Sequence, residues 1–307
     1  MKQDLFDEAI ATLITVQDWL RFGATLFEEA DLFFGHGADN AWSEAAQLIL
    51  PVLHLSPDYL PDVLSCRLLP TEKKQVADFF AQRVTKKIPA AYITEQAWFA
   101  GLRFYVNSHV LVPRSPIAEL IEQHFSPWLD SQEVLSIADI GTGSGCIACA
   151  CAHYFPDATV DAIDISADAL SVAQKNIAQH GLEDRVQAIQ SDLFAKVDSA
   201  KKYDLIVSNP PYVDQRGMDA LPVEFLAEPR LGLAAGQDGL DIVIPLLHQA
   251  AERLTENGIL IVEVGFSQPA LEAKFPDVPF LWLDFQRGGQ GVFLLTAEQL
   301  KSHFFLP

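Results

Sequence analysis

The 307-residue sequence has no apolar run long enough to cross a membrane, few cysteines and a shortage of basic residues. The first absence excludes a membrane-spanning protein. The N-terminus, Met1-Lys2-Gln3-Asp4, is acidic early and lacks the apolar core of a signal peptide. We therefore expect a cytoplasmic location and no membrane partner.

Only four cysteines are present, and their positions argue against both disulfides and a metal site. Cys146, Cys149 and Cys151 follow a glycine loop so closely that bridging them would distort a short helix. No second group of ligands stands at a spacing typical of zinc sites. We expect reduced cysteines that fill the core, and no metal cofactor.

Basic residues are scarce: 21 Lys and Arg stand against 41 Asp and Glu, a formal net charge of -20. Nucleic-acid binding depends on neutralising phosphates, so direct binding of nucleic acid is not expected. The charge is uneven, because residues 67–114 carry eight basic residues against three acidic ones. Such a chain would more naturally meet a basic partner, such as a ribosomal protein, although each charge run could equally be an ordinary solvated face.

The first third of the chain predicts helices. Apolar residues recur at helical spacing within residues 5–33, with a break expected near Gly23, and again within 43–50 and 71–87. We expect residues 1–97 to form a small helical domain that recognises the substrate. His36 lies between two glycines and is expected to be a turn residue rather than a catalyst.

A bridge of residues 98–114 follows. Aromatic and β-branched residues around Gly101 predict a β-hairpin, and residues 110–112 could add a strand. Ser115 and Pro116 can open a helix that continues to Phe125.

Residues 115–307 are expected to be the catalytic domain, because strands and helices alternate there. The expected strands are 134–140, 159–163, 186–189, 205–207, 259–264, 280–285 and 292–295. This pattern predicts an α/β fold with a mostly parallel sheet, helices on both faces and an antiparallel pair at one edge. The residues between the last two strands include Gly288-Gly289-Gln290, which we interpret as a glycine-rich hairpin turn.

The most informative stretch is Ser208-Asn209-Pro210-Pro211-Tyr212, directly after the run Tyr203 to Val207, which is expected to be a buried strand. Two prolines make a stiff ledge, on which the Asn209 side chain and the Pro210 carbonyl can both accept hydrogen bonds. The Tyr212 ring can cover a flat group from above. This arrangement favours a grip on a planar group that carries an NH2, with Asn209, Pro210 and Tyr212 as catalytic residues.

A second motif, Asp139 to Gly145, closes a strand and opens a helix, so its glycines let a ligand approach the backbone. Asp164, about twenty residues beyond the loop, can accept both hydroxyls of a ribose. Asp192 ends the third strand and could meet an adenine amino group, with Leu193 and Phe194 as apolar cover. A dinucleotide enzyme would share the loop and Asp164, but Cys146 replaces the last glycine of that fingerprint.

On these motifs the whole chain resembles the bacterial protein-glutamine methyltransferases of the HemK family. Gly35 to Trp42 and Val112 to Pro116 resemble the branch called PrmB, whose target is a glutamine of the third large-subunit ribosomal protein. The resemblance implies a seven-strand, Rossmann-like class I methyltransferase fold and S-adenosylmethionine as cofactor, with S-adenosylhomocysteine as product. It implies cofactor contacts from Asp139, Gly141, Thr142, Gly143, Ser144, Gly145, Asp164, Asp192, Leu193 and Asn209, and substrate contacts from Asn209, Pro210, Pro211 and Tyr212.

Three alternatives remain open on the residues. The release-factor branch of the same family performs the same chemistry on another protein. An adenine amino-group methyltransferase acting on DNA or RNA makes the same demands on an Asn-Pro-Pro-aromatic ledge, but it needs a basic groove, to which only residues 67–114 come close. A non-enzymatic assembly factor would be indicated by a damaged cofactor site, and no such loss is visible.

Overall fold

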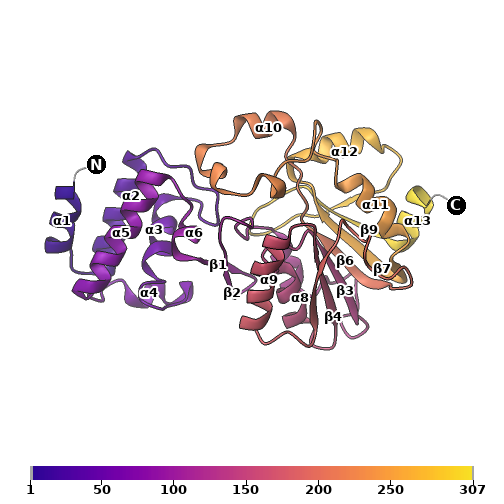
Figure 1. Cartoon of the computed structure of the whole chain (residues 1–307), viewed down its shortest axis with the longest axis horizontal. Coiled ribbons are helices and arrows are strands. Elements are labelled where there is room, and N and C mark those ends of the chain that lie inside the picture. Colours follow the sequence, from indigo (N-terminus) through magenta and orange to yellow (C-terminus); the bar gives the residue numbers. More distant parts are fainter. Residues whose placement is uncertain (1–2, 306–307) are drawn as a thin grey trace. The chain divides into compact units, whose positions relative to one another are not determined.

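The computed structural model describes residues 3–305, which divide into two compact units (Figure 1). The helical unit contains the described residues up to Ala97, together with Val106–Ser108 and Pro222–Glu228. The sheet unit contains Trp98–Tyr105, His109–Leu221 and the described residues from Pro229 onward. Pro222–Glu228 therefore belongs to the helical unit although it lies far along the chain, which the sequence did not predict.

The helical unit is built from short helices. They are α1 (Gln3–Thr12), α2 (Val16–Glu29), α3 (Ala41–Ile49), η1 (Pro57–Tyr59), α4 (Leu60–Val63), α5 (Pro70–Lys86), α6 (Ala90–Thr94) and η2 (Val223–Ala227). The break expected at Gly23 was wrong. The chain breaks instead before Thr15, whose side chain caps α2, and Gly23 is an interior residue of that helix. A Cβ at Gly23 would lie 2.6 Å from the Phe80 ring, so glycine permits close packing there.

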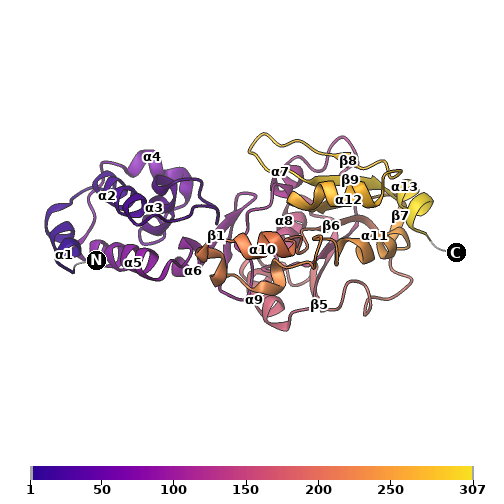
Figure 2. The same cartoon turned by 90° about the horizontal axis from the view of Figure 1, so that it is seen from above.

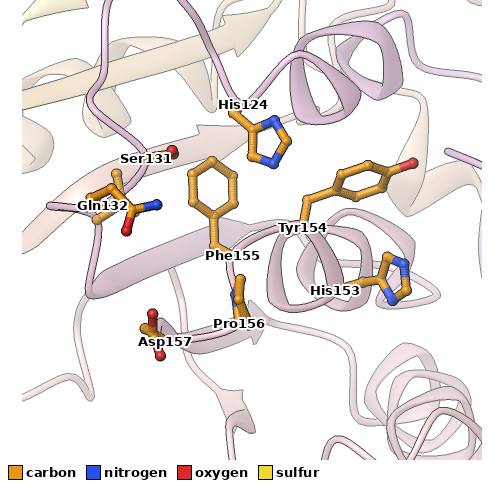
Figure 3. Close-up of a pocket in the computed structure, with 9 residues that line it drawn as sticks. His124, Ser131, Gln132, His153, Tyr154, Phe155, Pro156 and Asp157 are labelled. Carbon is orange, nitrogen blue, oxygen red and sulfur yellow. The ribbon is translucent and has the colours of Figure 1, made fainter.

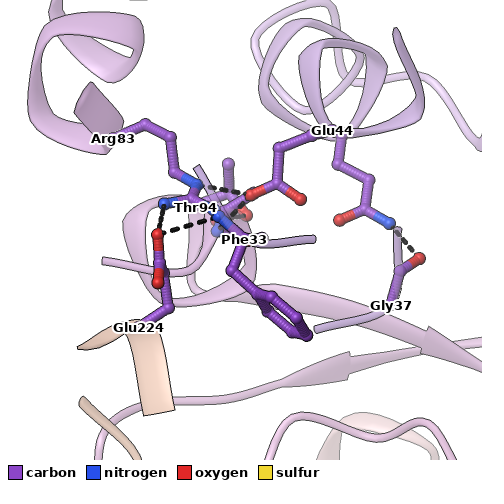
Figure 4. A network of polar contacts seen from close by, with 8 residues as sticks. Phe33, Gly37, Glu44, Arg83, Thr94 and Glu224 are labelled. Atoms are coloured by element: carbon purple, nitrogen blue, oxygen red, sulfur yellow. Dashed lines mark hydrogen bonds and ion pairs between the residues drawn. The ribbon is translucent and has the colours of Figure 1, made fainter. Parts of the chain in front are cut away.

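A buried ion network lies inside the helical unit (Figure 4). Arg83 is fully buried, and its Nε donates to Glu44 Oε1 over 2.6 Å. Its Nη1 lies 3.8 Å from Glu224 Oε1, which also accepts a hydrogen bond from the Phe33 backbone N–H. One of the positive charges of the basic segment 67–114, that of Arg83, is therefore buried in an ion network and does not lie on the surface.

His36 is buried beside the segment Pro222–Glu228. Its Nε2 lies 3.5 Å from Glu228 Oε2, and its ring packs against Phe225 with 4.4 Å between ring centroids. Glu224, Phe225 and Glu228 together fasten Pro222–Glu228 into the helical unit.

The sheet unit contains a seven-stranded sheet with the order β5-β4-β3-β6-β7-β9-β8. Its strands are β3 (Ser136–Ile140), β4 (Thr159–Asp164), β5 (Val186–Gln190), β6 (Tyr203–Ser208), β7 (Leu254–Glu263), β8 (Leu281–Trp282) and β9 (Val292–Thr296). The first five run parallel, and β9 pairs antiparallel with both β7 and β8. The α/β fold with a mostly parallel seven-strand sheet is confirmed. The bridge forms the expected hairpin of β1 (Gln96–Phe99) and β2 (Leu102–Tyr105).

Alternation along the strands divides the core into two layers. Leu205 and Val207 of β6 face one cluster, which includes α7 (Ile117–Glu122) and α8 (Cys146–Tyr154). Ile206 faces the other cluster. The helices α11 (Val243–Ala251), α12 (Gln268–Lys274) and α13 (Ala297–Phe304), labelled in Figure 2, contribute residues to this cluster. The remaining elements are α9 (Ala167–Gln179), α10 (Gln215–Ala220), η3 (Arg230–Gly232) and η4 (Gly265–Ser267).

Several local predictions were wrong. Residues 110–112 form no strand, and α7 ends at Glu122 because His124 and Phe125 take left-handed conformations. The strand expected at 280–285 is limited to β8, so the connection to β9 is no tight turn. It docks instead on α7, where the backbone N–H groups of Gln286 and Arg287 donate to the Glu119 carboxylate over 3.0 and 3.1 Å.

Three of the four cysteines lie in the core of the sheet unit. Cys146, Cys149 and Cys151 are unbridged and buried as expected, and burial raises the pKa of the Cys146 thiol to about 12. Cys66 is exposed, so the prediction that it fills the core was wrong.

Within residues 3–305, every helix is too short or too polar to span a membrane. The same residues contain no group of three or more His, Cys, Asp or Glu side chains suited to holding a metal ion.

Candidate active site

The two sequence motifs meet at the carboxyl ends of β3 and β6. The sheet order reverses at β3, with β4 and β5 on one side and β6 and β7 on the other, and ligands of such sheets bind at this point. Ile140 pairs with Ser208, whose Oγ donates to the Ile140 carbonyl over 2.7 Å. A Cβ on Gly141 would lie 3.9 Å from Pro210 Cα and 4.0 Å from the Asn209 carbonyl oxygen. The glycine loop and the Asn209–Tyr212 ledge are therefore neighbours.

Asp139, near the end of β3, holds the glycine loop in place through hydrogen bonds. Its Oδ2 accepts hydrogen bonds from Thr142 Oγ1 at 2.5 Å and from the Ala148 N–H at 3.0 Å. Its Oδ1 is buried without a partner among the described residues, and burial raises the pKa of the carboxyl to about 7. The hydrogen bonds of Oδ2 fasten the glycine loop to the first turn of α8, so Asp139 fixes the shape of the loop from inside the core.

Asp164 joins the end of β4 to the glycine loop. Its Oδ2 accepts from the Gly143 N–H over 2.9 Å, and its Oδ1 accepts from the Ser166 N–H over 2.8 Å. Burial raises the pKa of this carboxyl, and the backbone donors oppose that effect. Each oxygen keeps a second lone pair, so both can still accept a ligand hydroxyl.

The end of β5 differs from the expectation in one respect. Asp192 is exposed just beyond this strand, and Leu193 takes a left-handed conformation with a φ of 45°. Phe194 is buried against Tyr203, with 5.9 Å between ring centroids. The prediction that Phe194 covers an adenine is therefore wrong, because its ring fills the core, whereas Asp192 and Leu193 stay predicted contacts.

The ledge itself stands outside the sheet ladder. The pairing of β6 with β3 and β7 stops at Ser208, so Asn209 and Pro210 lie beyond the regular hydrogen bonds of the sheet. Tyr212 is held from two sides: its hydroxyl donates to Glu263 Oε1 over 3.0 Å, and its carbonyl accepts from Ser267 Oγ over 2.7 Å.

Comparisons with known proteins agree with this geometry. A family model described as "Methyltransferase small domain" matches residues 120–238. The chain is 47% identical over 297 residues to the "Ribosomal protein uL3 glutamine methyltransferase" of Francisella tularensis subsp. tularensis, covering 96% of this chain and 94% of that relative. It is 48% identical to the protein of the same name from Neisseria gonorrhoeae, covering 96% of this chain and 99% of that relative. This chain belongs to the uL3 glutamine methyltransferase family.

A solved structure supports the fold of this methyltransferase. The catalytic domain of hMettl16, in complex with MAT2A 3'UTR hairpin 6, superposes with a TM-score of 0.52 at 17% sequence identity. The match covers 72% of this chain and 82% of the hMettl16 chain. At this identity the likeness concerns the class I methyltransferase fold alone.

Three polar residues around the site were missed by sequence reasoning. Glu263 and Ser267 hold Tyr212, and Asn176 on α9 is fully buried between the glycine loop and β2. The Asn176 side chain donates to the carbonyls of Ser144 and Tyr105 over 2.8 and 2.9 Å, and it accepts from the Tyr105 N–H over 2.7 Å. Each contact joins residues at least 30 positions apart, so no local pattern could have revealed it.

The sheet unit has a hollow of about 410 Å³ that is lined by residues such as His124, His153 and Tyr154 (Figure 3). It lies at the amino ends of β3 and β4, away from the motifs. A second hollow, of about 370 Å³, is lined by residues that include Asp214, Phe266 and Ser267, and Ser267 is the residue whose Oγ donates to the Tyr212 carbonyl.

Proposed function

We propose that this protein transfers a methyl group from S-adenosylmethionine to the side-chain amide nitrogen (N5) of a glutamine in ribosomal protein uL3. The observation that carries the proposal is the identity of 47% and 48% to two proteins of that name across 96% of the chain. The cytoplasmic location, and the lack of nucleic-acid and membrane partners, stay predictions.

The glycine loop and its neighbours fit the proposed cofactor. When bound, S-adenosylmethionine supplies an electrophilic methyl group on a sulfonium cation, and S-adenosylhomocysteine is the product. Gly141, Gly143 and Gly145 all have positive φ values, which glycine adopts without strain, and the absence of a Cβ leaves room for a ligand to approach the backbone. Asp164 would hold the ribose, and Asp139 would hold the glycine loop in place through Thr142 and the Ala148 N–H.

The ledge fits the proposed substrate. An amide nitrogen is a poor nucleophile because its lone pair is delocalised, so the enzyme must hold both N–H bonds and aim the nitrogen. The Asn209 side chain and the Pro210 carbonyl are two acceptors outside the sheet ladder, and Tyr212 supplies an aromatic face. After transfer the nitrogen is strongly acidic and can release its proton to water, so no dedicated general base is required.

The helical unit is proposed to recognise uL3. A loop begins at Val213, directly after Tyr212, and returns at Ala234, which forms a β-bridge with Val213. Its segment Pro222–Glu228 belongs to the helical unit. In that segment the charged side chains of Glu224 and Glu228 are buried, and the apolar side chains are at the surface, with Val223 49% and Leu226 77% exposed. Val223 and Leu226 are the proposed apolar contacts for uL3, because Glu224 and Glu228 anchor the segment that carries them at the surface of the helical unit.

The test is an incubation of the purified enzyme with labelled cofactor and four separate substrates: uL3, release factors, DNA and RNA. We expect label in uL3, with mass spectrometry placing one methyl group on a glutamine side chain. Label in release factors alone would favour the other branch of the family. Label in adenine would replace the proposal with nucleic-acid methylation.

A further inference from the structure

Glu263, the last residue of β7, is a buried carboxylate that the proposed chemistry does not use. Its Oε1 accepts a hydrogen bond from the Tyr212 hydroxyl over 3.0 Å. Its Oε2 accepts from Ser115 Oγ over 2.5 Å. Both oxygens thus accept from a hydroxyl donor, one in the motif Val112–Pro116 and the other in the Asn209–Tyr212 ledge.

The rest of Tyr212 is fixed as well. Ser267 Oγ donates to its carbonyl over 2.7 Å. Gly265, with a φ of 46°, lies under the ring, and a Cβ there would come within 2.6 Å of ring atom Cε2. Backbone, ring face and hydroxyl are therefore each held by a different residue of β7 or of the turn that follows it.

A buried carboxylate at this position needs a reason. Burial raises the pKa of Glu263, while the Ser115 and Tyr212 hydroxyls and the charge of Arg114 oppose that effect. A hydrogen bond to a carboxylate is stronger than one to a neutral group, so it restricts the ring more firmly. A tyrosine ring has two rotatable side-chain bonds, and a tether at its far end removes most of that freedom.

We propose that Glu263 is a positioning residue for methyl transfer, which fixes the Tyr212 ring beside the substrate amide by holding its hydroxyl. This inference rests on the proposed function and adds a residue that acts through Tyr212. The Ser115 hydroxyl donates to Oε2 of Glu263, and this hydrogen bond orients the carboxylate so that Oε1 faces the Tyr212 hydroxyl. Such preorganisation contributes to the transfer step rather than to cofactor affinity.

The test is a double-mutant cycle of Glu263→Gln and Tyr212→Phe, with uL3 as substrate. Glutamine keeps the shape but offers a single, neutral acceptor, so we expect kcat to fall about tenfold, with KM for uL3 and cofactor Kd changed less than about twofold. In the Tyr212→Phe background the same substitution should lower kcat by less than about twofold, because the hydroxyl is already absent. Glu256→Gln, an exposed site on the same strand, is the matched control and should keep the parent kcat.

Calorimetric titration of the cofactor is measured for every variant and separates positioning from loss of fold. An unchanged kcat for Glu263→Gln, an equal loss in both backgrounds, or a loss of cofactor binding would each overturn the positioning role. If the parent enzyme does not methylate uL3 at all, the proposed function fails and this inference fails with it. Parent activity with an unaffected Glu263→Gln variant would overturn this inference alone.

Discussion

The backbone N–H of Gly143 donates a hydrogen bond to Oδ2 of Asp164 over 2.9 Å, so the glycine loop is tied to the end of β4. The other oxygen of Asp164 accepts from the Ser166 N–H at the start of α9. One carboxylate therefore orients two backbone segments while it stays available to a ligand. Sequence spacing predicted that Asp164 binds a ligand, but it did not predict that Asp164 orients the backbone of the glycine loop and of α9.

Replacement of Asp164 by alanine should weaken binding of S-adenosylmethionine about tenfold or more, because a charge-assisted contact contributes roughly 1.5 to 3 kcal/mol. Calorimetric titration measures this directly. Asp168→Ala, the same deletion at an exposed position of α9, is the control and should bind as the parent does. Equal affinity of the Asp164 variant would refute its assignment to the cofactor.

The stability of the cofactor-free protein should depend on pH through Asp139. Burial raises the pKa of this carboxyl from 3.8 to about 7, so between these values the folded state binds more protons than the unfolded state. Stability therefore falls as pH rises through this window and is lowest above about pH 7. In urea unfolding from pH 5.5 to 8, Asp139→Asn should show a smaller decline than the parent. Identical pH slopes would contradict the raised pKa.

Arg83 should be required for folding of the helical unit. Arg83→Ala would leave the carboxylates of Glu44 and Glu224 buried without their cation, which typically costs about 3–5 kcal/mol. Denaturant unfolding measures the loss, and Lys86→Ala, at an exposed position of the same helix, should change stability by less than about 0.5 kcal/mol. Similar stability of both variants would show that the network is not structural.

The sequence predicted those parts of the fold that local patterns encode. The β6 strand is an apolar run, and the residues Asp139 to Gly145 carry their turn geometry in their own glycines. The Glu224–Arg83 and Glu263–Tyr212 contacts join residues far apart in the chain. Both bury carboxylates, which composition alone assigns to the surface. The role of Gly23 also depends on a distant residue, because its missing Cβ makes room for the Phe80 ring while α2 continues through it.

Recognition of uL3 should depend on Leu226. Leu226→Ser removes an exposed apolar side chain from the segment that Glu224 and Glu228 anchor, so folding should be unaffected. If the partner covers this side chain, KM for uL3 should rise about tenfold, the effect of burying one leucine, with kcat and cofactor Kd unchanged. Leu135→Ser, 57% exposed in the sheet unit, is the control. A parent KM for Leu226→Ser would place recognition elsewhere.

Asn209 is the residue on which the proposed mechanism depends. Its side-chain oxygen is proposed to accept a hydrogen bond from the substrate amide and to hold the nitrogen in line with the methyl group, so its contribution should appear in transfer. Asn209→Ala should lower kcat about a hundredfold or more, the loss seen when one preorganised polar group is removed from a site, with cofactor Kd changed only a few-fold.

Asn209→Asp separates the acceptor role from the amide group. Aspartate keeps an acceptor oxygen but replaces the NH2 with charge, which disturbs whatever group orients the side chain. We expect activity above that of Asn209→Ala and below that of the parent, in rapid single-turnover assays that report transfer alone. Ala220→Ser, at an exposed position beyond the ledge, should be neutral. Parent rates for both Asn209 variants would mean that Asn209–Tyr212 is only a rigid loop, because a deleted acceptor cannot leave an aligned nucleophile undisturbed.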